Sequence, residues 1–416
     1  MQIDREKGVE SVNRSNSIAA NLDKWMQMTK GLSGDYCIRA KIDMKEQRKS
    51  LRDPVIYRCN DIPHQRTKDK YKVYPCYDFA CSLVDSLEGV THAMRTSEYK
   101  DHDSLYKWIQ EKAKVRIVRL EDFARLNFVN TVLSKRKLQH IIEMKAVEGW
   151  NDPRIPTIQG ISRRGLQPQA IIEFMLEQGP SKNNTLMQWD KLWSINKKIV
   201  DESAGRYTAV VKGNSSLVIR NASEEKTLLV DLHPKNPLLG KKEVKCYKEV
   251  LIESEDAERI KEGEKVTLMK WGNCIINSKE EIRGKIKLVG ELIEDKNFKD
   301  TKKLTWIPLN DNLRVHCKLI EFGPLIKKPK VEETDNIDDI VNYDSKKEIE
   351  AYGELEFKKL KEKDVIQIER RGYFYVDIPW SESTRCITLH YIPEGKTKPM
   401  SILQPKINIK TIIKGT

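Results

Sequence analysis

The chain has 416 residues and a mass of 48.4 kDa, so we expect two to four domains rather than one core. Its composition, 39% hydrophobic and 33% charged, is typical of a soluble globular protein, and no apolar run approaches the roughly 20 residues that span a bilayer. The formal charge of +13 favours a polyanionic partner such as nucleic acid, although a solvated lysine-rich surface would give the same excess.

The first seven residues lack the apolar segment of a secretory signal. Eight scattered cysteines form no C-x-x-C pair and no zinc-type spacing with histidines. We therefore expect reduced structural thiols, no zinc and a cytoplasmic location.

The N-terminal third predicts mixed α and β structure. Residues 17–30 read as an amphipathic helix, with Ile18, Leu22 and Trp25 on one face and Ser17 as its cap. Residues 36–43 alternate like a half-buried strand, and residues 115–118 read as a second short strand.

The middle of the chain predicts helices. Residues 169–178 carry an apolar stripe that Gly179 ends, and a second stripe runs from Trp189 through Trp193 to Ile199. We interpret the tryptophan stripe as core rather than as a cofactor site.

After Arg206 the pattern changes to short alternating runs separated by Gly, Pro, Asn and Asp, which indicates β-barrels or sandwiches. Such runs occupy residues 227–230, 285–288, 303–306, 366–368 and 386–391. We expect the acidic stretch 332–339 to be an exposed insertion, and we find no internal repeat.

The strongest local signal for chemistry is the segment Thr131 to Leu138, which contains Ser134-Lys135-Arg136-Lys137. A basic turn before a helix is more often a solvated face than a site. However, a mobile ammonium, a hydroxyl and backbone N–H groups can together hold phosphates.

Val132-Leu133-Ser134-Lys135-Arg136 resembles the K-M-S-K-S loop of class I aminoacyl-tRNA synthetases, in the form of the glutamyl and glutaminyl branch. The resemblance extends over most of residues 9–210. It is carried by the segments 39–44, 52–59, 74–81, 85–92, 123–128, 149–154 and 160–165. The segment 188–198 resembles the glutamyl version of the family's helical stem-contact region, and the C-terminal half is similar, more loosely, to the family's paired anticodon-binding β-barrels. The chain as a whole resembles the eukaryotic-type cytosolic glutamyl-tRNA synthetases.

The resemblance implies a multidomain α/β plus all-β fold. Its expected parts are the remainder of an acceptor-stem-binding insertion (1–72), the second half of a Rossmann-type catalytic domain (73–138), a helical stem-contact region (139–212) and two anticodon-binding β-barrels (213–416). The implied reaction is ATP-dependent activation of L-glutamate and its transfer to tRNA(Glu), with Mg²⁺ accompanying ATP.

The family pocket for the amino acid is built on Tyr77 and on the residue eighteen positions later, which is Arg95 here. A buried guanidinium can form a bidentate ion pair with the side-chain carboxylate of glutamate. The neutral amide of glutamine would leave the guanidinium buried without a charged partner. This argues against the glutaminyl alternative. Taken alone, Arg95 could instead form a surface salt bridge with Glu98.

Further roles follow only from the resemblance. Lys135 and Ser134 are the expected catalytic residues. The expected ATP-binding residues are Arg125, Leu126, Ser134, Lys135 and Arg136. The expected tRNA-binding residues are Arg163, Arg164, Arg370 and Arg371. Near the last two, Tyr373 and Phe374 could stack on bases or could simply be core aromatics.

The sequence departs from the family at one signature. No His-x-x-His, and therefore no H-I-G-H motif, occurs in the 416 residues. We expect the first half of the nucleotide-binding fold, and the N-terminal domain through which family members dock to multisynthetase partners, to be missing. A non-catalytic tRNA-binding fragment or paralogue is then the alternative to an active ligase.

Overall fold

The computed structural model describes residues 2–32, 34–213, 215–282 and 284–395. The chain divides into two compact units. Unit 1 comprises Met1–Leu126 and Pro180–Thr185, and unit 2 comprises Asn127–Gly179 and Leu186–Thr416. The division falls inside the expected 73–138 domain. No helix in the described ranges is long and apolar enough to cross a membrane.

Unit 1 begins with two helices and a three-stranded antiparallel sheet. These elements are α1 (Gln2–Lys7), α2 (Ile18–Thr29), β1 (Cys37–Arg39), β2 (Val55–Cys59) and β3 (Val73–Pro75). The helix at 17–30 is confirmed, but its predicted core face is wrong. Ile18 and Leu22 are 79% and 58% exposed, and Met28 is the residue of α2 that is buried. Only Trp25 packs as expected, against Tyr57.

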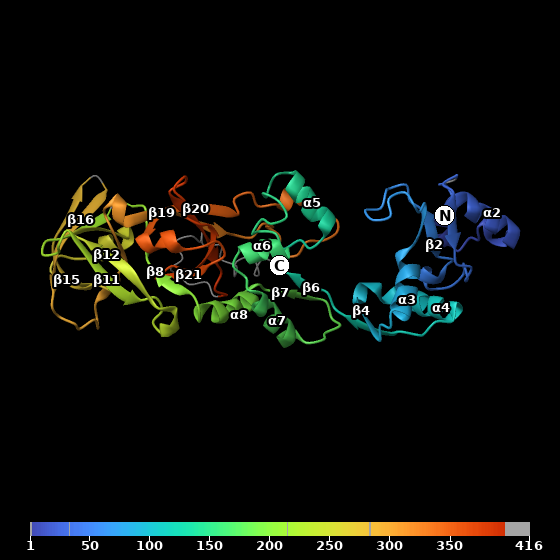
Figure 1. Ribbon diagram of the computed structural model, residues 1–416, viewed down its shortest axis with the longest axis horizontal. Helices are drawn as coiled ribbons and strands as arrows, with labels where there is room; N and C mark the ends of the chain where they lie inside the picture. Colours follow the sequence, from blue (N-terminus) through green and yellow to red (C-terminus); the bar gives the residue numbers. More distant parts are fainter. Residues whose placement is uncertain (1, 33, 214, 283, 396–416) are drawn as a thin grey trace, which may run out of the picture. The chain divides into compact units, whose positions relative to one another are not determined.

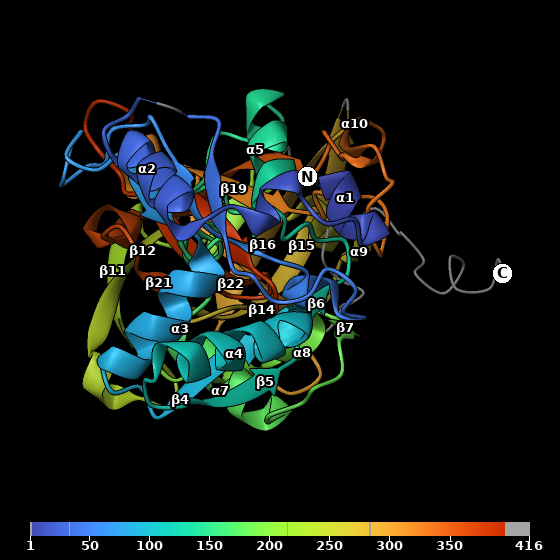
Figure 2. The ribbon, with the colours of Figure 1, turned by 90° about the vertical axis from the view of Figure 1, so that its right-hand side faces the viewer.

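The second part of unit 1 is a parallel pair of strands with two helices. Its elements are α3 (Tyr77–Leu87), β4 (His92–Thr96), α4 (Asp103–Ala113) and β5 (Arg119–Phe123). Figure 2 shows α3 and α4 side by side. The strand predicted at 115–118 is wrong in position, because β5 begins at Arg119 and residues 115–118 form the extended approach to it.

The chain crosses between the units through β6 (Leu126–Phe128) and β7 (Thr185–Met187), which pair with each other. Unit 2 then contains α5 (Lys135–Glu143), α6 (Ile158–Arg163), α7 (Pro168–Gln178) and α8 (Asp190–Asp201). The helix predicted at 169–178 is confirmed, with Gly179 at φ 66° after it. The tryptophan stripe is core as expected, since Trp193 is only 4% exposed.

Two β domains complete unit 2, each with a seven-stranded sheet. The first has the order β17-β14-β15-β16-β10-β13-β18, and the second has β8-β21-β22-β23-β19-β20-β9. The first comprises β10 (Ser215–Ile219), β13 (Glu249–Ile252), β14 (Lys265–Leu268), β15 (Gly272–Ile282), β16 (Lys285–Ile293), β17 (Lys302–Leu304) and β18 (Trp306–Pro308). The second comprises β8 (Gly205–Tyr207), β9 (Ala209–Val211), β19 (Arg314–Phe322), β20 (Lys346–Glu354), β21 (Val365–Ile368), β22 (Gly372–Ile378) and β23 (Cys386–Ile392).

The hairpin of β11 (Glu225–Asp231) and β12 (Lys241–Tyr247) packs on the core of the first β domain, and α9 (Ser254–Arg259) follows β13. All five short runs predicted as strands lie in this part of the chain. They are confirmed, except that the run at 303–306 is split between β17 and β18. Figure 1 shows α8 beside β8 and β21 of the second β domain.

The two β domains share one pattern of strand pairing, although the sequence shows no internal repeat. In both sheets the order of parallel and antiparallel pairings is the same along the seven strands. Lys270 and Arg370, in equivalent turns, have φ 68° and φ 66°. The shared pairing pattern is not visible in the sequence, because a β sheet constrains the alternation of apolar and polar residues and the turns far more than the identity of each side chain.

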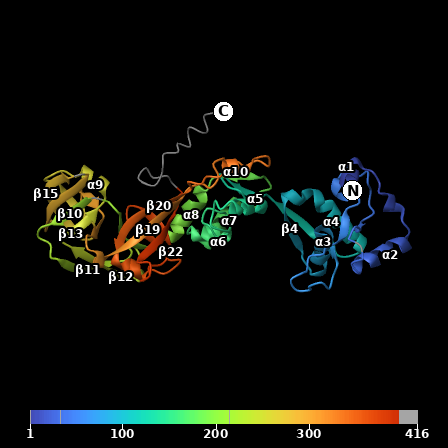
Figure 3. The same cartoon turned by 90° about the horizontal axis from the view of Figure 1, so that it is seen from above.

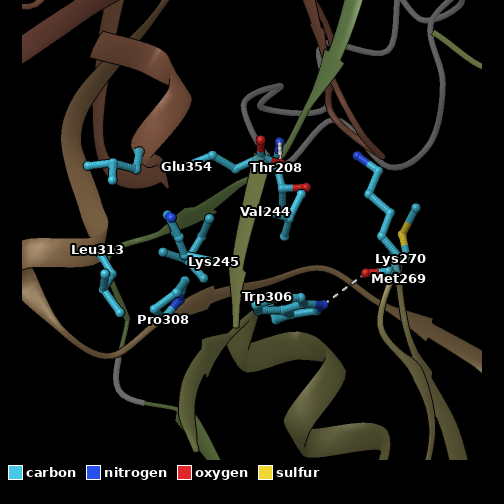
Figure 4. A pocket seen from close by; sticks show the side chains of 11 residues that line it. Thr208, Val244, Lys245, Met269, Lys270, Trp306, Pro308, Leu313 and Glu354 are labelled. Atoms are coloured by element: carbon cyan, nitrogen blue, oxygen red, sulfur yellow. Dashed lines mark hydrogen bonds between the residues drawn. The ribbon is translucent and has the colours of Figure 1, made fainter. Parts of the chain in front are cut away.

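Ion pairs join the two β domains where these turns meet. Lys270 lies 2.7 Å from Glu369, and a buried pair forms between Lys242 of β12 and Glu354 at the end of β20. Figure 4 shows a small cavity at this junction, with Lys270, Glu354 and Thr208 among its lining residues. Because the partners come from different β domains, these contacts fix one domain against the other.

Candidate functional site

The signature loop leads directly into α5. Ser134 is the N-cap of this helix, but its hydroxyl makes no capping hydrogen bond. Ser134, Lys135 and Arg136 are all exposed, and the first turn of α5 has no acidic residue. Cations at a helix N-terminus oppose the helix dipole, whereas an anion bound there would be favoured. The loop therefore offers a hydroxyl, free backbone N–H groups and two cationic side chains to a phosphate.

A small core holds α5 in place. Val132, Leu138 and Ile141 pack with Ile326 and Ile337 from the segment between β19 and β20. We call this segment, residues 323–345, the β19–β20 connection. It contains α10 (Ile337–Ile340), which lies against α5 (Figure 3).

Polar contacts reinforce this packing on both sides of the loop. Asn130, at φ 54°, donates its backbone N–H to Pro329 O at 2.8 Å and its side-chain amide to Ile326 O at 3.0 Å. Lys137 Nζ lies 2.9 Å from Glu332 O, and the His140 ring is 2.7 Å from Asp338 Oδ1. A segment nearly 200 residues downstream thus fixes the base of the signature loop.

The acidic stretch 332–339 is therefore not a free insertion, as the sequence suggested. Ile337 within it is 5% exposed, and Asp335 forms an ion pair with Lys328 at 2.7 Å. The carboxylates face solvent or cations, while the apolar residues between them bury against α5. Charge alone predicted exposure, but it did not reveal that the same segment carries an apolar face.

The helical region also supports the loop. Trp189 Nε1 donates a hydrogen bond to Thr131 Oγ1 at 3.0 Å, and its ring stacks on Phe128 at 4.0 Å between centroids. Trp193 follows at 6.3 Å. The tryptophans thus act as structural support immediately before the signature loop.

The expected amino-acid pocket lies in unit 1. Arg95 on β4 is 9% exposed, and among the described residues neither of its terminal nitrogens makes a hydrogen bond of good geometry. Burial lowers the pKa of Arg95 and the Tyr77 hydroxyl raises it, with a net increase, so the guanidinium stays charged. The alternative of a salt bridge with Glu98 is wrong, because Glu98 lies 3.1 Å from Arg125 instead.

Tyr77 begins α3 and is 60% exposed, so its phenol is accessible. Cys81 Sγ lies 3.6 Å from Tyr77 Oη and 3.4 Å from Asp85 Oδ2. These three residues follow each other at four-residue spacing on one face of α3. The four-residue spacing of Tyr77, Cys81 and Asp85 is visible in the sequence and is the signal that places Cys81 and Asp85 beside Tyr77.

Arg125 and Leu126, expected near the adenine, lie at the end of unit 1. The Arg125 backbone N–H donates to Asn184 Oδ1 at 3.3 Å, and its guanidinium is engaged by Glu98. Ser134, Lys135 and Arg136 belong to unit 2, whereas Arg125 and Leu126 belong to unit 1. Their joint role in binding ATP stays a prediction.

Each of the four arginines expected to bind tRNA already has a partner in unit 2. Arg163 forms a bidentate pair with Asp377 at 2.8 Å, and Arg164 donates to Phe322 O and lies over the ring of Trp193. Burial lowers the pKa of Arg164 to about 10.

Arg370 pairs with Asp256, and Arg371 pairs with Glu253 at 2.6 Å. Tyr373 and Phe374 are only 2% and 1% exposed, so they are core aromatics rather than stacking faces for bases. The geometry thus gives all four arginines a structural role, and their contact with tRNA stays a prediction.

No group of three or more His, Cys, Asp or Glu side chains among the described residues is placed to hold a metal ion.

Comparison with known proteins places the chain in a family. Residues 1–202 match the family described as tRNA synthetases class I (E and Q), catalytic domain. Residues 204–291 and 303–377 each match a family described as tRNA synthetases class I (E and Q), anti-codon binding domain. The first of these matches covers most of the first β domain together with β8 and β9, and the second covers β19 to β22 of the second β domain.

Named relatives agree with this result. The chain is 46% identical over 403 residues to the cytoplasmic glutamate–tRNA ligase of Arabidopsis thaliana, covering 95% of this chain and 56% of that protein. It is 42% identical over 404 residues to the probable cytoplasmic glutamate–tRNA ligase of Schizosaccharomyces pombe, covering 95% of this chain and 56% of that protein.

The bifunctional glutamate/proline–tRNA ligase of Drosophila melanogaster is 41% identical over 421 residues, covering 98% of this chain and 25% of that protein. The chain thus spans about half the length of the single-function relatives and a quarter of the bifunctional one. With a catalytic-domain match followed by two anticodon-binding matches, this chain belongs to the class I tRNA synthetases of the glutamyl and glutaminyl (E and Q) branch.

Proposed function

We propose that the chain is the glutamate-selecting and tRNA-binding part of a glutamate–tRNA ligase that acts in the cytoplasm. The observation that carries this proposal is Arg95, a charged guanidinium that is 9% exposed and has two unpartnered terminal nitrogens. A buried unpaired charge is costly, so its retention calls for an anionic ligand. The side-chain carboxylate of glutamate supplies that charge, and the neutral amide of glutamine does not.

The signature loop is proposed to act on ATP. Lys135 and Ser134, with Arg136, would contact the phosphates and stabilise the negative charge that develops as the glutamyl adenylate forms. Arg125 and Leu126 would lie by the adenine. Mg²⁺ would accompany the phosphates, since this ion is usually held by substrate phosphates with one or two carboxylates. No general acid or base is needed for this step.

The two β domains are proposed to bind the anticodon region of tRNA(Glu), as the descriptions of their matching families suggest. We further propose that they form the expected pair of β-barrels and that α5–α8 contact the tRNA stem. The excess positive charge of +13 supports a polyanionic partner. Attachment to other synthetase units is a related possibility that the bifunctional relatives illustrate.

The decisive experiment is charging of tRNA(Glu) with radiolabelled glutamate or glutamine. The protein used is a fusion of residues 1–416 to the part of the Arabidopsis thaliana relative that lies outside the aligned region. We expect charging with glutamate and at least a hundredfold lower kcat/KM for glutamine, the size of discrimination that loss of a buried ionic partner gives. Preferential charging with glutamine would overturn the proposed substrate.

Binding of tRNA by the chain alone is tested separately by filter binding. Its affinity should fall linearly on a plot of log K against log salt concentration, because phosphate contacts release counterions. An affinity for tRNA that does not change with salt would show that the basic surface is not the binding face.

A further inference from the structure

Arg95 is surrounded by aromatic rings rather than by carboxylates. Its Cζ lies 4.8 Å from the ring centroid of Tyr106 and 5.5 Å from that of Tyr99. A guanidinium within about 6 Å of a tyrosine centroid is attracted to the negative face of the ring. The two rings thus stabilise the positive charge without accepting a hydrogen bond from the terminal nitrogens of the guanidinium.

The Tyr106 ring is fixed by its surroundings. It is 1% exposed, it packs with Ala93 and Val118, and its hydroxyl donates to Asp85 Oδ2 at 2.7 Å. Asp85 also contacts Cys81 Sγ at 3.4 Å. The Asp85 carboxylate is thereby engaged by Tyr106 and Cys81, and it does not hydrogen-bond to the terminal nitrogens of Arg95.

The Tyr99 ring is positioned by two other rings, those of Tyr77 and His102. Its ring centroid lies 6.0 Å from that of Tyr77 and 6.1 Å from that of His102. His102 Nδ1 lies 3.1 Å from Asp78 Oδ1 in the first turn of α3. Although Tyr99 is 42% exposed, these neighbours limit where its ring can lie.

We propose that Tyr99 and Tyr106 are positioning residues that hold the Arg95 cation against their rings and leave its terminal nitrogens available to the ligand carboxylate. The inference rests on the proposed function, because it assigns glutamate as the ligand of Arg95. A carboxylate of the protein in their place would compete with the substrate for the same N–H groups. The rings stabilise the cation yet leave its two parallel donors vacant for a bidentate pair.

The first test needs no ligand. Rotation of the Arg95 guanidinium about its Nε–Cζ bond is measured by NMR in the 416-residue chain, with the signal assigned through Arg95→Lys. We expect slow rotation in the wild type, severalfold faster rotation in Tyr99→Leu, and wild-type behaviour in Tyr99→Phe. Free rotation in the wild type, or no change in Tyr99→Leu, would overturn the proposal whether or not glutamate binds.

The matched control is Tyr352→Leu in the second β domain. It removes a similar contact, since Arg314 Cζ lies 3.8 Å from the Tyr352 centroid, but it belongs to unit 2. It should leave the Arg95 signal unchanged. Tyr106 is buried, so the conservative Tyr106→Phe is used there, and it should retain the wild-type restraint because it keeps the ring.

The second test measures selectivity. Binding of L-glutamate and L-glutamine to the chain is compared by calorimetry for Tyr99→Phe and for progressively fluorinated phenylalanines at position 99. Fluorination weakens the negative ring face with little change in size. We expect glutamate affinity to fall stepwise, by about tenfold in total, with glutamine affinity unchanged.

The two tests separate the two claims. Equal losses for glutamate and glutamine would mean that Tyr99 merely supports the fold, and the positioning role would be rejected. If the wild type restrains Arg95 but binds both amino acids equally, glutamate selection by Arg95 is wrong. The restraint of Arg95 by the rings would then be confirmed, but its role in the selection of glutamate would be rejected.

Discussion

At the scale of single residues, the most informative group is a charge without a partner. Arg95 carries two unpartnered terminal nitrogens in a buried site, whereas Arg163, Arg370 and Arg371 are paired with carboxylates. In the sequence these four arginines look alike, because each lies in or near a segment that resembles the family. Only their surroundings distinguish a cation that awaits a ligand from cations that hold the fold together.

Replacing Arg95 should change the choice of amino acid. In the fusion protein described above, Arg95→Ala should lower kcat/KM for glutamate by about 10²–10³, because breaking a buried charge pair costs about 3–5 kcal/mol. The neutral glutamine should lose much less. The measurement is the ratio of kcat/KM for the two amino acids, and equal losses for both would remove Arg95 from the specificity pocket.

Replacing Lys135 should affect turnover. Lys135 is exposed in the first turn of α5. Its ammonium group is therefore accessible to the phosphates of ATP in the transition state. Lys135→Ala in the fusion protein should lower kcat by about 10²–10³, comparable with the loss of one preorganised donor. Gln139→Ala, on the same helix, serves as control. A raised KM for ATP with unchanged kcat would contradict this role.

At the scale of elements, the signature loop depends on a segment far away in the sequence. The hydroxyl and cations of Ser134 and Lys135 are presented by α5, and α5 packs on Ile326 and Ile337 of the β19–β20 connection. A nine-residue helix gains little stability by itself, so its position comes from this packing. The β19–β20 connection therefore acts as a structural support of the signature loop.

Removing one apolar contact should loosen this support. Ile337→Ala deletes buried methyl groups and should cost about 2–4 kcal/mol, mostly as local unfolding of α10 and α5. We expect faster hydrogen exchange of the amides in Lys135–Glu143, while β14 and β15 remain protected. Asp339→Ala, on the exposed side of α10, is the control. Unchanged protection of α5 in Ile337→Ala would rule out the supporting role.

At the scale of the whole molecule, unit 2 is organised around a repeated β domain and the ion pairs at its junction. The buried pair of Lys242 and Glu354 is the most enclosed of these, with Thr208 N donating to Glu354 Oε1 at 2.8 Å. Burial of two charges is expensive, and a well-made pair only offsets that cost. Such a pair favours one arrangement of the domains more than it adds stability.

Mutation of this pair should therefore be strongly non-additive. Lys242→Met leaves Glu354 buried without its cation and should cost about 3–5 kcal/mol in the free energy of unfolding. The double variant with Lys242→Met and Glu354→Gln should be near neutral or more stable, because no charge remains buried and the amide oxygen can still accept from Thr208. Urea denaturation of the wild type, Lys242→Met, Glu354→Gln and the double variant measures the coupling, and additive effects would argue against a coupled pair.

The same pair predicts a pH dependence. Burial, opposed by Glu354, lowers the pKa of Lys242 from 10.5 to about 8 in the folded chain. The unfolded state then binds the proton more tightly, so stability from this group rises as pH increases from about 8 to 10.5. As the pH rises through this range, the free energy of unfolding of the wild type should increase relative to that of the double variant. A constant difference between pH 7 and pH 10 would contradict it.

The sequence by itself determined the family and the order of the parts. Linear motifs such as Val132 to Arg136, helix stops such as Gly179 and alternating β runs are local patterns, so they can be read without coordinates. The helices at 17–30 and 169–178 and the strands after Arg206 were predicted for that reason. So were Tyr77 and Arg95 as a pair, because the family fixes their spacing.

Only the tertiary structure decided which faces are buried and which charges are paired. The predicted core face of α2 was wrong, because Ile18 and Leu22 are exposed and burial depends on which distant segments pack against a helix. The charges of the acidic stretch gave no indication that Ile337 within it is buried. The shared strand pairing of the two β domains is likewise not visible as a repeat of side chains. The rings of Tyr99 and Tyr106 meet Arg95 only after β4, the turn that follows it and α4 have packed together. Burial and pairing are set by contacts between distant segments, whereas the sequence reports directly only on neighbours along the chain.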